Sequence, residues 1–289
     1  FSIAFLIYYL TKIDYLIFDK IRINYVLLSL SLILLWSGFI ISAISWKAAL
    51  KANNIKIDNK KAVYSQGAAI FAKYIPGKIW VILGRATIVA HDKKELLKTS
   101  AVSLKEQLVY LVLGLLTSFG VLLFMPVNEW YLVVIFFTVA GLSLFLFSKK
   151  IHSIGETLFK KVFGKSIDIP FVNISKSLPY AGVLLTLWFV WSIGFYVLCR
   201  SVYPETNFVA AFIFPVSVSY GLLAVFLPGG IGVREGIMVL LLTSSGMDPA
   251  MATTISVLSR IWFITGEIFI FSAAFVAKRK QSVPANRIS

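Results

Sequence analysis

The sequence predicts an all-α polytopic membrane protein that forms one transmembrane domain over residues 1–289. Apolar residues make up 58% of the chain and come in runs of about twenty, the length that an α-helix needs to cross the hydrocarbon core of a bilayer. Two interrupted apolar segments are similar to each other, and Lys and Arg gather in alternate loops. These three observations predict an inverted repeat, in which each unit is a span, a re-entrant helical hairpin and a second span.

The apolar runs give the spans in chain order. Uninterrupted runs predict spans at 24–50, 102–125, 131–147, 180–200 and 251–277. Two further runs, 62–90 and 209–246, each contain a break. The opening stretch, 1–10, is apolar but too short to span, so we interpret it as part of a truncated helix. Pro179 suits the first turn of the helix that follows it.

The breaks lie in two copies of one sequence pattern. At an offset of 152 positions, residues 72–84 and 224–236 are identical at six of thirteen positions. Each copy contains a Pro-Gly pair, Pro76-Gly77 and Pro228-Gly229, and proline interrupts a helix because it lacks the N–H group and clashes with the preceding turn. Two broken apolar segments at matching places indicate a binding site of the transporter type.

The distribution of basic residues orients the chain. The loops at 47–61, 93–105 and 149–176, with the C-terminal tail, hold 19 Lys and Arg, whereas 11–23, 126–130, 200 and 246–249 hold four. We expect the first set and the C-terminus to be cytoplasmic, in a prokaryotic plasma membrane. The first hairpin then enters and leaves from the cytoplasm and the second from outside. The repeat units are about 24–125 and 176–277, with the span 131–147 between them.

The breaks and the cations near them are the candidate site. A new helix can begin after each Pro-Gly, at about Lys78 and Ile231, and the N-terminus of a helix attracts phosphate or carboxylate. We expect an anionic lipid headgroup to bind among the following residues: Pro76, Gly77, Lys78, Arg85, Pro228, Gly229, Gly230, Gly232, Arg234, Glu235 and Arg260. The structural alternative is that the Pro-Gly pairs only kink two helices while the cations extend to the interface.

Charged residues at membrane depth need partners. The cations there are Lys73, Lys78, Arg85, Arg234 and Arg260, and the candidate charge partners include Glu106 and Glu267. A Glu235–Arg260 or a Glu106–Arg234 pair would neutralise charge in a buried site, and Glu267 shares a helix face with Arg260. A purely structural ion pair explains the same residues equally well.

Composition excludes other chemistry. Cys199 is the single cysteine, which excludes an internal disulfide, and His91 and His152 lie in separate loops, so we expect no metal site. The glycines after Pro228 miss the dinucleotide-binding spacing by one residue and lack a βαβ context, so no cofactor is expected. The net charge of +15 is explained by cytoplasmic loops, and no nucleic acid is expected as a partner.

The motifs resemble a known family. Residues 226–236, followed by Gly246 and Ser259-Arg260, resemble the lysylphosphatidylglycerol synthase transmembrane-region family of flippase-like integral membrane proteins. Trp46-Lys47, the stretch 74–79 and Arg85 are similar to the family's first half. Leu83-Gly84 precedes Arg85, where the family commonly has Gly-Asp or Gly-Glu. The resemblance implies lipid translocation, or a membrane component of glycolipid or polyprenyl-phosphate metabolism.

Three functions remain open from the sequence. The first is a translocase that moves an anionic phospholipid or a polyprenyl-phosphate-linked lipid between leaflets, passively or driven by an ion gradient because no ATP motif is present. The second is an intramembrane lipid transferase, for which Glu106, Glu235 and Glu267 are the available bases. The third is a non-catalytic membrane partner of a lipid or glycan synthase. We expect translocation without covalent chemistry, with anionic lipids as the binding partners.

Overall fold

The fold is all-α, as predicted. The structure, a computed structural model, describes residues 23–75, 79–124, 129–150, 153–154, 157, 172–224 and 227–279, and these ranges contain helices and no strand. Four of the described helices are long and apolar enough to cross a bilayer. They are α2 (Tyr25–Ala52), α5 (Lys93–Thr117), α9 (Ile174–Val202) and α12 (Pro249–Arg279).

Each interrupted segment forms a pair of short helices between two long ones. Between α2 and α5 lie α3 (Asn59–Ala68), η2 (Ile70–Tyr74) and α4 (Ile79–Val89). Between α9 and α12 lie α10 (Ala210–Leu223), η3 (Pro228–Gly230) and α11 (Val233–Ser244). None of these short α-helices exceeds 14 residues, which is too short to cross about 30 Å of hydrocarbon at a rise of about 1.5 Å per residue. The order of a long helix, a broken pair and a long helix therefore occurs twice.

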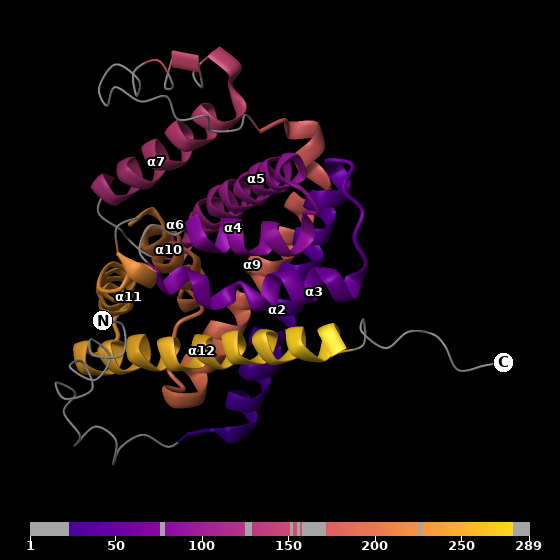
Figure 1. Cartoon of the computed structure of the whole chain (residues 1–289). Helices are drawn as coiled ribbons and strands as arrows, with labels where there is room; N and C mark the ends of the chain where they lie inside the picture. The colour runs from indigo at the N-terminus through magenta and orange to yellow at the C-terminus, as the bar shows by residue number, and fades with distance from the viewer. Residues whose placement is uncertain are drawn as a thin grey trace.

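The segment between the two units is peripheral. The short helix α6 (Gly120–Phe124) and α7 (Glu129–Phe147) follow α5, and α7 forms where the span 131–147 was predicted. Helix α7 packs on α5 and lies at the edge of the molecule in Figure 1. The predicted truncated helix at 1–10 lies outside the described residues.

Two long helices begin earlier than the hydropathy predicted. Helix α5 starts at Lys93 and not near residue 102, because Asp92 accepts a hydrogen bond from the backbone N–H of Glu95 (2.7 Å) and caps the helix. Helix α9 starts at Ile174 with Asn173 as its N-cap, so Pro179 lies in the second turn and not in the first. Hydropathy finds the apolar part of a membrane helix, whereas the cap residues decide where the polar first turns begin.

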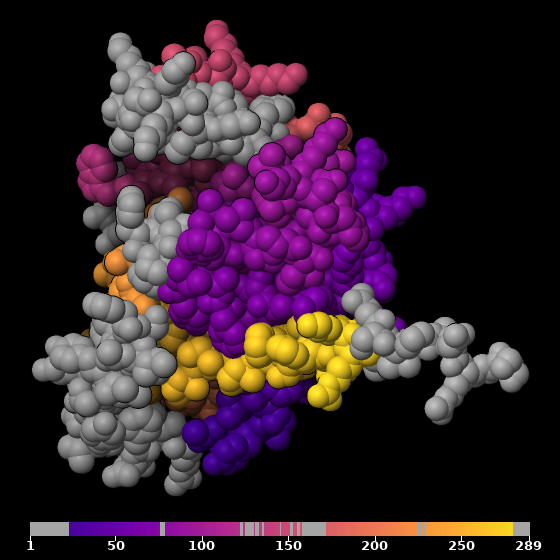
Figure 2. Space-filling view, viewed as in Figure 1, coloured from indigo at the N-terminus to yellow at the C-terminus, as the bar shows by residue number. Residues whose placement is uncertain are grey.

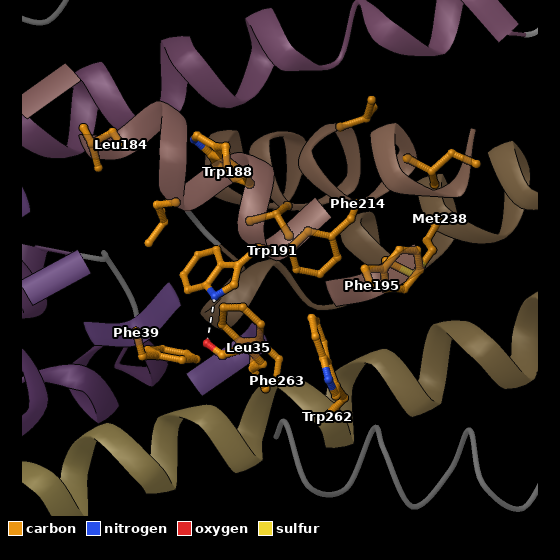
Figure 3. Close-up of a cluster of buried hydrophobic side chains, with 14 of the residues drawn as sticks. Leu35, Phe39, Leu184, Trp188, Trp191, Phe195, Phe214, Met238, Trp262 and Phe263 are labelled. Carbon is orange, nitrogen blue, oxygen red and sulfur yellow. Dashed lines mark hydrogen bonds between the residues drawn. The ribbon is translucent and has the colours of Figure 1, made fainter. Parts of the chain in front are cut away.

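The centre of the molecule is the contact between α2 and α9. Trp191 of α9 lies over Gly38 of α2, where a Cβ atom would come within 2.1 Å of the indole nitrogen, and it donates a hydrogen bond to the carbonyl of Leu35 (3.1 Å). Figure 3 shows that bond and the surrounding aromatic cluster, which includes Phe39 of α2 and Phe263 of α12. This packed core gives the broken helices a rigid support.

The two units are interleaved. Helix α3 of the first unit packs on α12 of the second, and α10 of the second packs on α5 of the first. Figure 2 shows α12 as a band that crosses the face next to the helices of the first unit. If α2, α3, α4 and α5 are exchanged with α9, α10, α11 and α12, the main helix contacts of one unit become those of the other. This correspondence supports the repeat, while the membrane side of each loop stays a prediction.

Thiol labelling tests the predicted inversion. We expect single cysteines at the exposed positions Lys56 and His91, on the two sides of the first broken pair, to react with a membrane-impermeant reagent from the cytoplasm only. Cysteines at the exposed positions Glu205 and Ser244, on the two sides of the second pair, should react only from outside. If the cysteines at positions 56 and 91 react from opposite sides of the membrane, the first pair of short helices crosses the membrane and the predicted inversion is wrong.

Candidate functional site

The first unit holds a fully buried ion pair. Arg85 of α4 donates from Nη2 to Oε2 of Glu106 on α5 (2.6 Å), and the two side chains are 0% and 3% exposed. Its Nε donates to the hydroxyl of Ser103 (2.6 Å), and Nη1 donates to Oε1 of Gln66 (3.1 Å). The guanidinium also lies over the ring of Trp46, 4.3 Å from its centroid. Each of the three guanidinium nitrogens thus has a protein partner, which is the arrangement of a structural pair.

This geometry corrects one predicted contact. The predicted Glu106–Arg234 pair does not form, because Glu106 is bound to Arg85. Glu106 also supplies the acidic partner that the residues before Arg85 lack, since it comes from the next helix and not from the preceding residues. Helical periodicity within one segment could not show which of two arginines, 149 positions apart in the sequence, would reach it.

The second unit holds the predicted Glu235–Arg260 pair. Nε of Arg260, on α12, donates to Oε1 of Glu235 on α11 (2.8 Å), and Nη1 donates to the backbone carbonyl of Gly229 (3.1 Å). Oε2 of Glu235 accepts from the backbone N–H of Gly232 (2.8 Å). The pair therefore satisfies a carbonyl and an N–H group that the second break leaves outside a helix.

The two ion pairs have opposite polarity. In the first unit the arginine lies on the short helix and the carboxylate on the following long helix; in the second unit the carboxylate lies on the short helix and the arginine on the long one. Arg234, the neighbour of Glu235 on α11, therefore receives no carboxylate from α12. In the described part of the chain, Arg85 and Arg260 each form an ion pair with a glutamate, and none is found for Arg234.

Arg234 is buried without a partner for two of its nitrogens. The residue is 5% exposed, and its Nε and Nη2 atoms have no hydrogen-bond partner in the described part of the chain. Its guanidinium carbon lies 5.3 Å from the ring centroid of Phe214 and 5.0 Å from that of Phe263. Cation–π contact offsets some of the cost of burying the charge, but a buried donor without an acceptor still costs about 1–3 kcal/mol.

The first break reaches the last helix of the second unit. Lys73 of η2 forms an ion pair with Glu267 of α12, and the Tyr74 hydroxyl donates to the other oxygen of that carboxylate (2.9 Å). Glu267 therefore binds η2, which precedes the first Pro-Gly pair. The ring of Tyr74 also lies against Gly229, where a Cβ atom would come within 3.2 Å of the ring, so η2 and η3 are in contact.

Five charged residues form one group, which we call the break cluster: Lys73, Arg234, Glu235, Arg260 and Glu267. The two carboxylates and Arg234 are buried, whereas Lys73 and Arg260 are partly exposed. Arg234 lies within electrostatic range of Arg260, Glu235 and Glu267, and Lys73 lies within range of Arg234 and Arg260. Three cations face two carboxylates, so the cluster carries one surplus positive charge. Because two of the cations are held in ion pairs, the surplus charge is located at Arg234.

The structure places the other predicted residues as follows. Pro228, Gly229 and Gly230 form η3, and Gly232 precedes α11. Pro76, Gly77 and Lys78 lie outside the described residues. At the start of α11, the carboxylate of Glu235 accepts the N–H of the N-cap residue Gly232, and the side chain of Arg234 leaves the first turn of the same helix.

A comparison with protein families identifies the chain's relatives. The family described as the lysylphosphatidylglycerol synthase TM region matches residues 2–265, which is nearly the whole chain. The protein belongs to this family. Membership in the lysylphosphatidylglycerol synthase transmembrane-region family indicates a function related to membrane lipids, and together with the four long apolar helices it identifies an integral membrane protein. No curated protein matches the chain.

In this family member, Gly230 fixes the geometry of the second break. Its φ angle is 68°, and a Cβ atom would lie 2.5 Å from the carbonyl oxygen of Gly221 on α10. We expect Gly230→Ala to lower the free energy of unfolding by about 2 kcal/mol or more, because both the backbone angle and the contact with backbone oppose a side chain. Thermal unfolding in detergent measures the loss.

Gly236→Ala is the matched control for this substitution. Gly236 lies inside α11, where a Cβ atom would meet no atom within 4 Å, so alanine should leave stability unchanged or raise it slightly. Equal losses in the two variants would contradict the assignment of Gly230 as a position of close helix approach.

Proposed function

We propose that this protein moves lipids with an anionic headgroup, either a phospholipid or a polyprenyl-phosphate-linked lipid, between the two leaflets of the membrane. The single observation that carries the proposal is the buried edge of Arg234, whose Nε and Nη2 have no partner among the described residues, in a cluster with one surplus positive charge. A charge at membrane depth without a protein partner is costly and marks a candidate site for an ion or a substrate.

The surrounding fold suits this function. Backbone outside a regular helix is tolerated at membrane depth where it is buried in protein or lines a cavity, and transporter sites often form where two broken helices meet. Here η2 and η3 are in contact, and the residues of the break cluster come from η2, α11 and α12, with Arg260 also bound to the carbonyl of Gly229 in η3. In our proposal the headgroup passes the cluster while its acyl chains stay in the bilayer.

The pairing of the carboxylates favours transport over covalent chemistry. The three glutamates considered as bases are each bound to a cation: Glu106 to Arg85, Glu235 to Arg260 and Glu267 to Lys73. A neighbouring cation stabilises the ionised carboxylate and so lowers its strength as a base. A transferase that uses one of them would first have to break a buried ion pair.

Reconstitution into liposomes tests the proposal. We expect the purified protein to move fluorescent short-chain anionic lipids from the inner to the outer leaflet, where dithionite bleaches them, without forming a covalent product. Arg234→Gln should reduce this transport to the rate of empty liposomes. Arg200→Gln removes the same charge from an exposed helix end and should transport normally.

The same experiment separates the alternatives. A covalently modified lipid would identify a transferase, and neither transport nor product would favour a non-catalytic partner of a synthase. Normal transport by Arg234→Gln would show that the headgroup path does not include the break cluster.

A further inference from the structure

The free edge of Arg234 has a defined shape. A guanidinium group is planar, and its Nε–H and one Nη2–H point in parallel from the same edge. These are the two nitrogens that lack partners in the described part of the chain. Two parallel N–H groups fit two oxygens of one carboxylate or phosphate, a geometry that a single ammonium group does not offer.

Access to the guanidinium is restricted on one side. The rings of Phe214 and Phe263 have centroids 6.1 Å apart, so they lie next to each other and form one apolar wall against Arg234. That wall contributes no hydrogen-bond donor. An anion therefore has to bind along the free edge, in the plane of the guanidinium.

The other cations of the break cluster are engaged. Lys73 is bound to Glu267, and Arg260 is bound to Glu235 and to the carbonyl of Gly229. Nη2 of Arg260 has no hydrogen-bond partner in the described part of the chain, but it lies 2.5 Å from Oε1 of Glu235 in the ion pair. An anion at Arg234 can therefore accept two parallel hydrogen bonds, from Nε and Nη2, and it meets one surplus positive charge. A singly charged anion neutralises the cluster, whereas a doubly charged one leaves a buried negative charge without a partner, which costs several kcal/mol.

We propose that the break cluster selects a singly charged phosphodiester, whose two free oxygens match the Arg234 edge, and discriminates against phosphomonoesters and diphosphates. This inference rests on the proposed function and specifies the substrate class of the same site. Two kinds of lipid present this group, a glycerophospholipid whose phosphate carries a further alcohol and a prenyl phosphosugar. The site recognises the chemistry that they share.

Equilibrium binding in detergent tests the inference. The probes are dihexanoylphosphatidylglycerol and a short prenyl phosphosugar as diesters, and dihexanoylphosphatidic acid and a short prenyl diphosphate as multiply charged competitors, all at pH 8, where a phosphomonoester is largely doubly charged. We expect at least one diester to bind about tenfold or more tightly than both competitors, and the stronger diester identifies the source. Arg234→Lys should weaken diester binding by about tenfold or more, since it keeps the charge but loses one charge-assisted hydrogen bond.

Each outcome decides the inference. It is overturned if either competitor binds as tightly as the diesters, if no probe binds, or if Arg234→Lys binds like the wild type. Leaflet transport without this selectivity would leave the proposed function standing and the inference refuted. Selective binding through Arg234 without leaflet transport would support the inference and refute the proposed function.

Discussion

Replacing Arg234 with methionine is expected to make the protein more stable while it stops lipid transport. Methionine matches the unbranched stem of the buried side chain as far as Nε and removes two donors that have no partner in the described residues. Removing that penalty should raise the free energy of unfolding by about 2 kcal/mol, less the lost cation–π contacts with Phe214 and Phe263. Thermal unfolding in detergent and the liposome assay together measure the two effects.

Arg200→Met is the control for this experiment. Arg200 is exposed near the end of α9, and its guanidinium donates a hydrogen bond to the hydroxyl of Tyr196 (3.3 Å). We expect its substitution to change stability by less than about 0.5 kcal/mol and to leave transport intact. A large loss of stability in Arg234→Met would instead mean that Arg234 supports the fold.

The second large effect is expected at Glu106. Glu106→Gln leaves the guanidinium of Arg85 buried without a counter-charge, which should lower the free energy of unfolding by about 3–5 kcal/mol. The amide keeps one acceptor oxygen and replaces the other with an NH2 donor, so the loss reports on the charge and on the hydrogen bonds of one carboxylate oxygen. Denaturant unfolding in mixed micelles measures it, and the fraction that remains folded should still transport, because Arg85 is not part of the break cluster.

A double substitution tests whether the loss of stability comes from the unpaired charge of Arg85. Arg85→Met combined with Glu106→Gln removes both charges and should recover much of the stability that the single Glu106→Gln change loses. Glu205→Gln, at an exposed position after the end of α9, is the control and should cost less than about 0.5 kcal/mol. Additive losses in the double variant would refute a coupled Arg85–Glu106 pair.

Hydropathy and the internal repeat predicted most of the fold. Both broken segments could be located because each combines an apolar run with Pro-Gly, and the long helices because their apolar windows reach the thickness of a bilayer. Helix starts could not be placed in this way. Asp92 and Asn173 set the starts of α5 and α9 through side-chain hydrogen bonds, which do not contribute to hydropathy.

The site was predicted in part, for a physical reason. Glu235–Arg260 could be proposed because both residues lie near the second break, in helices that follow one another. The contact of Lys73 with Glu267 joins positions 194 apart and depends on how the units interleave, so only the tertiary structure could show it. The same holds for Arg234, because only the tertiary structure shows that two of its nitrogens have no partner in the described part of the chain.

The interleaved packing of α3 on α12 and of α10 on α5 limits the motions that are open to this protein. Rocking one sequence half against the other as a rigid body would separate both interfaces at once and expose their buried surfaces. Such a movement is energetically expensive, because packed interfaces resist gradual deformation. If the protein transports lipids as we propose, we expect its movement to be short and local, near η2 and η3, while the interfaces between the long helices stay assembled.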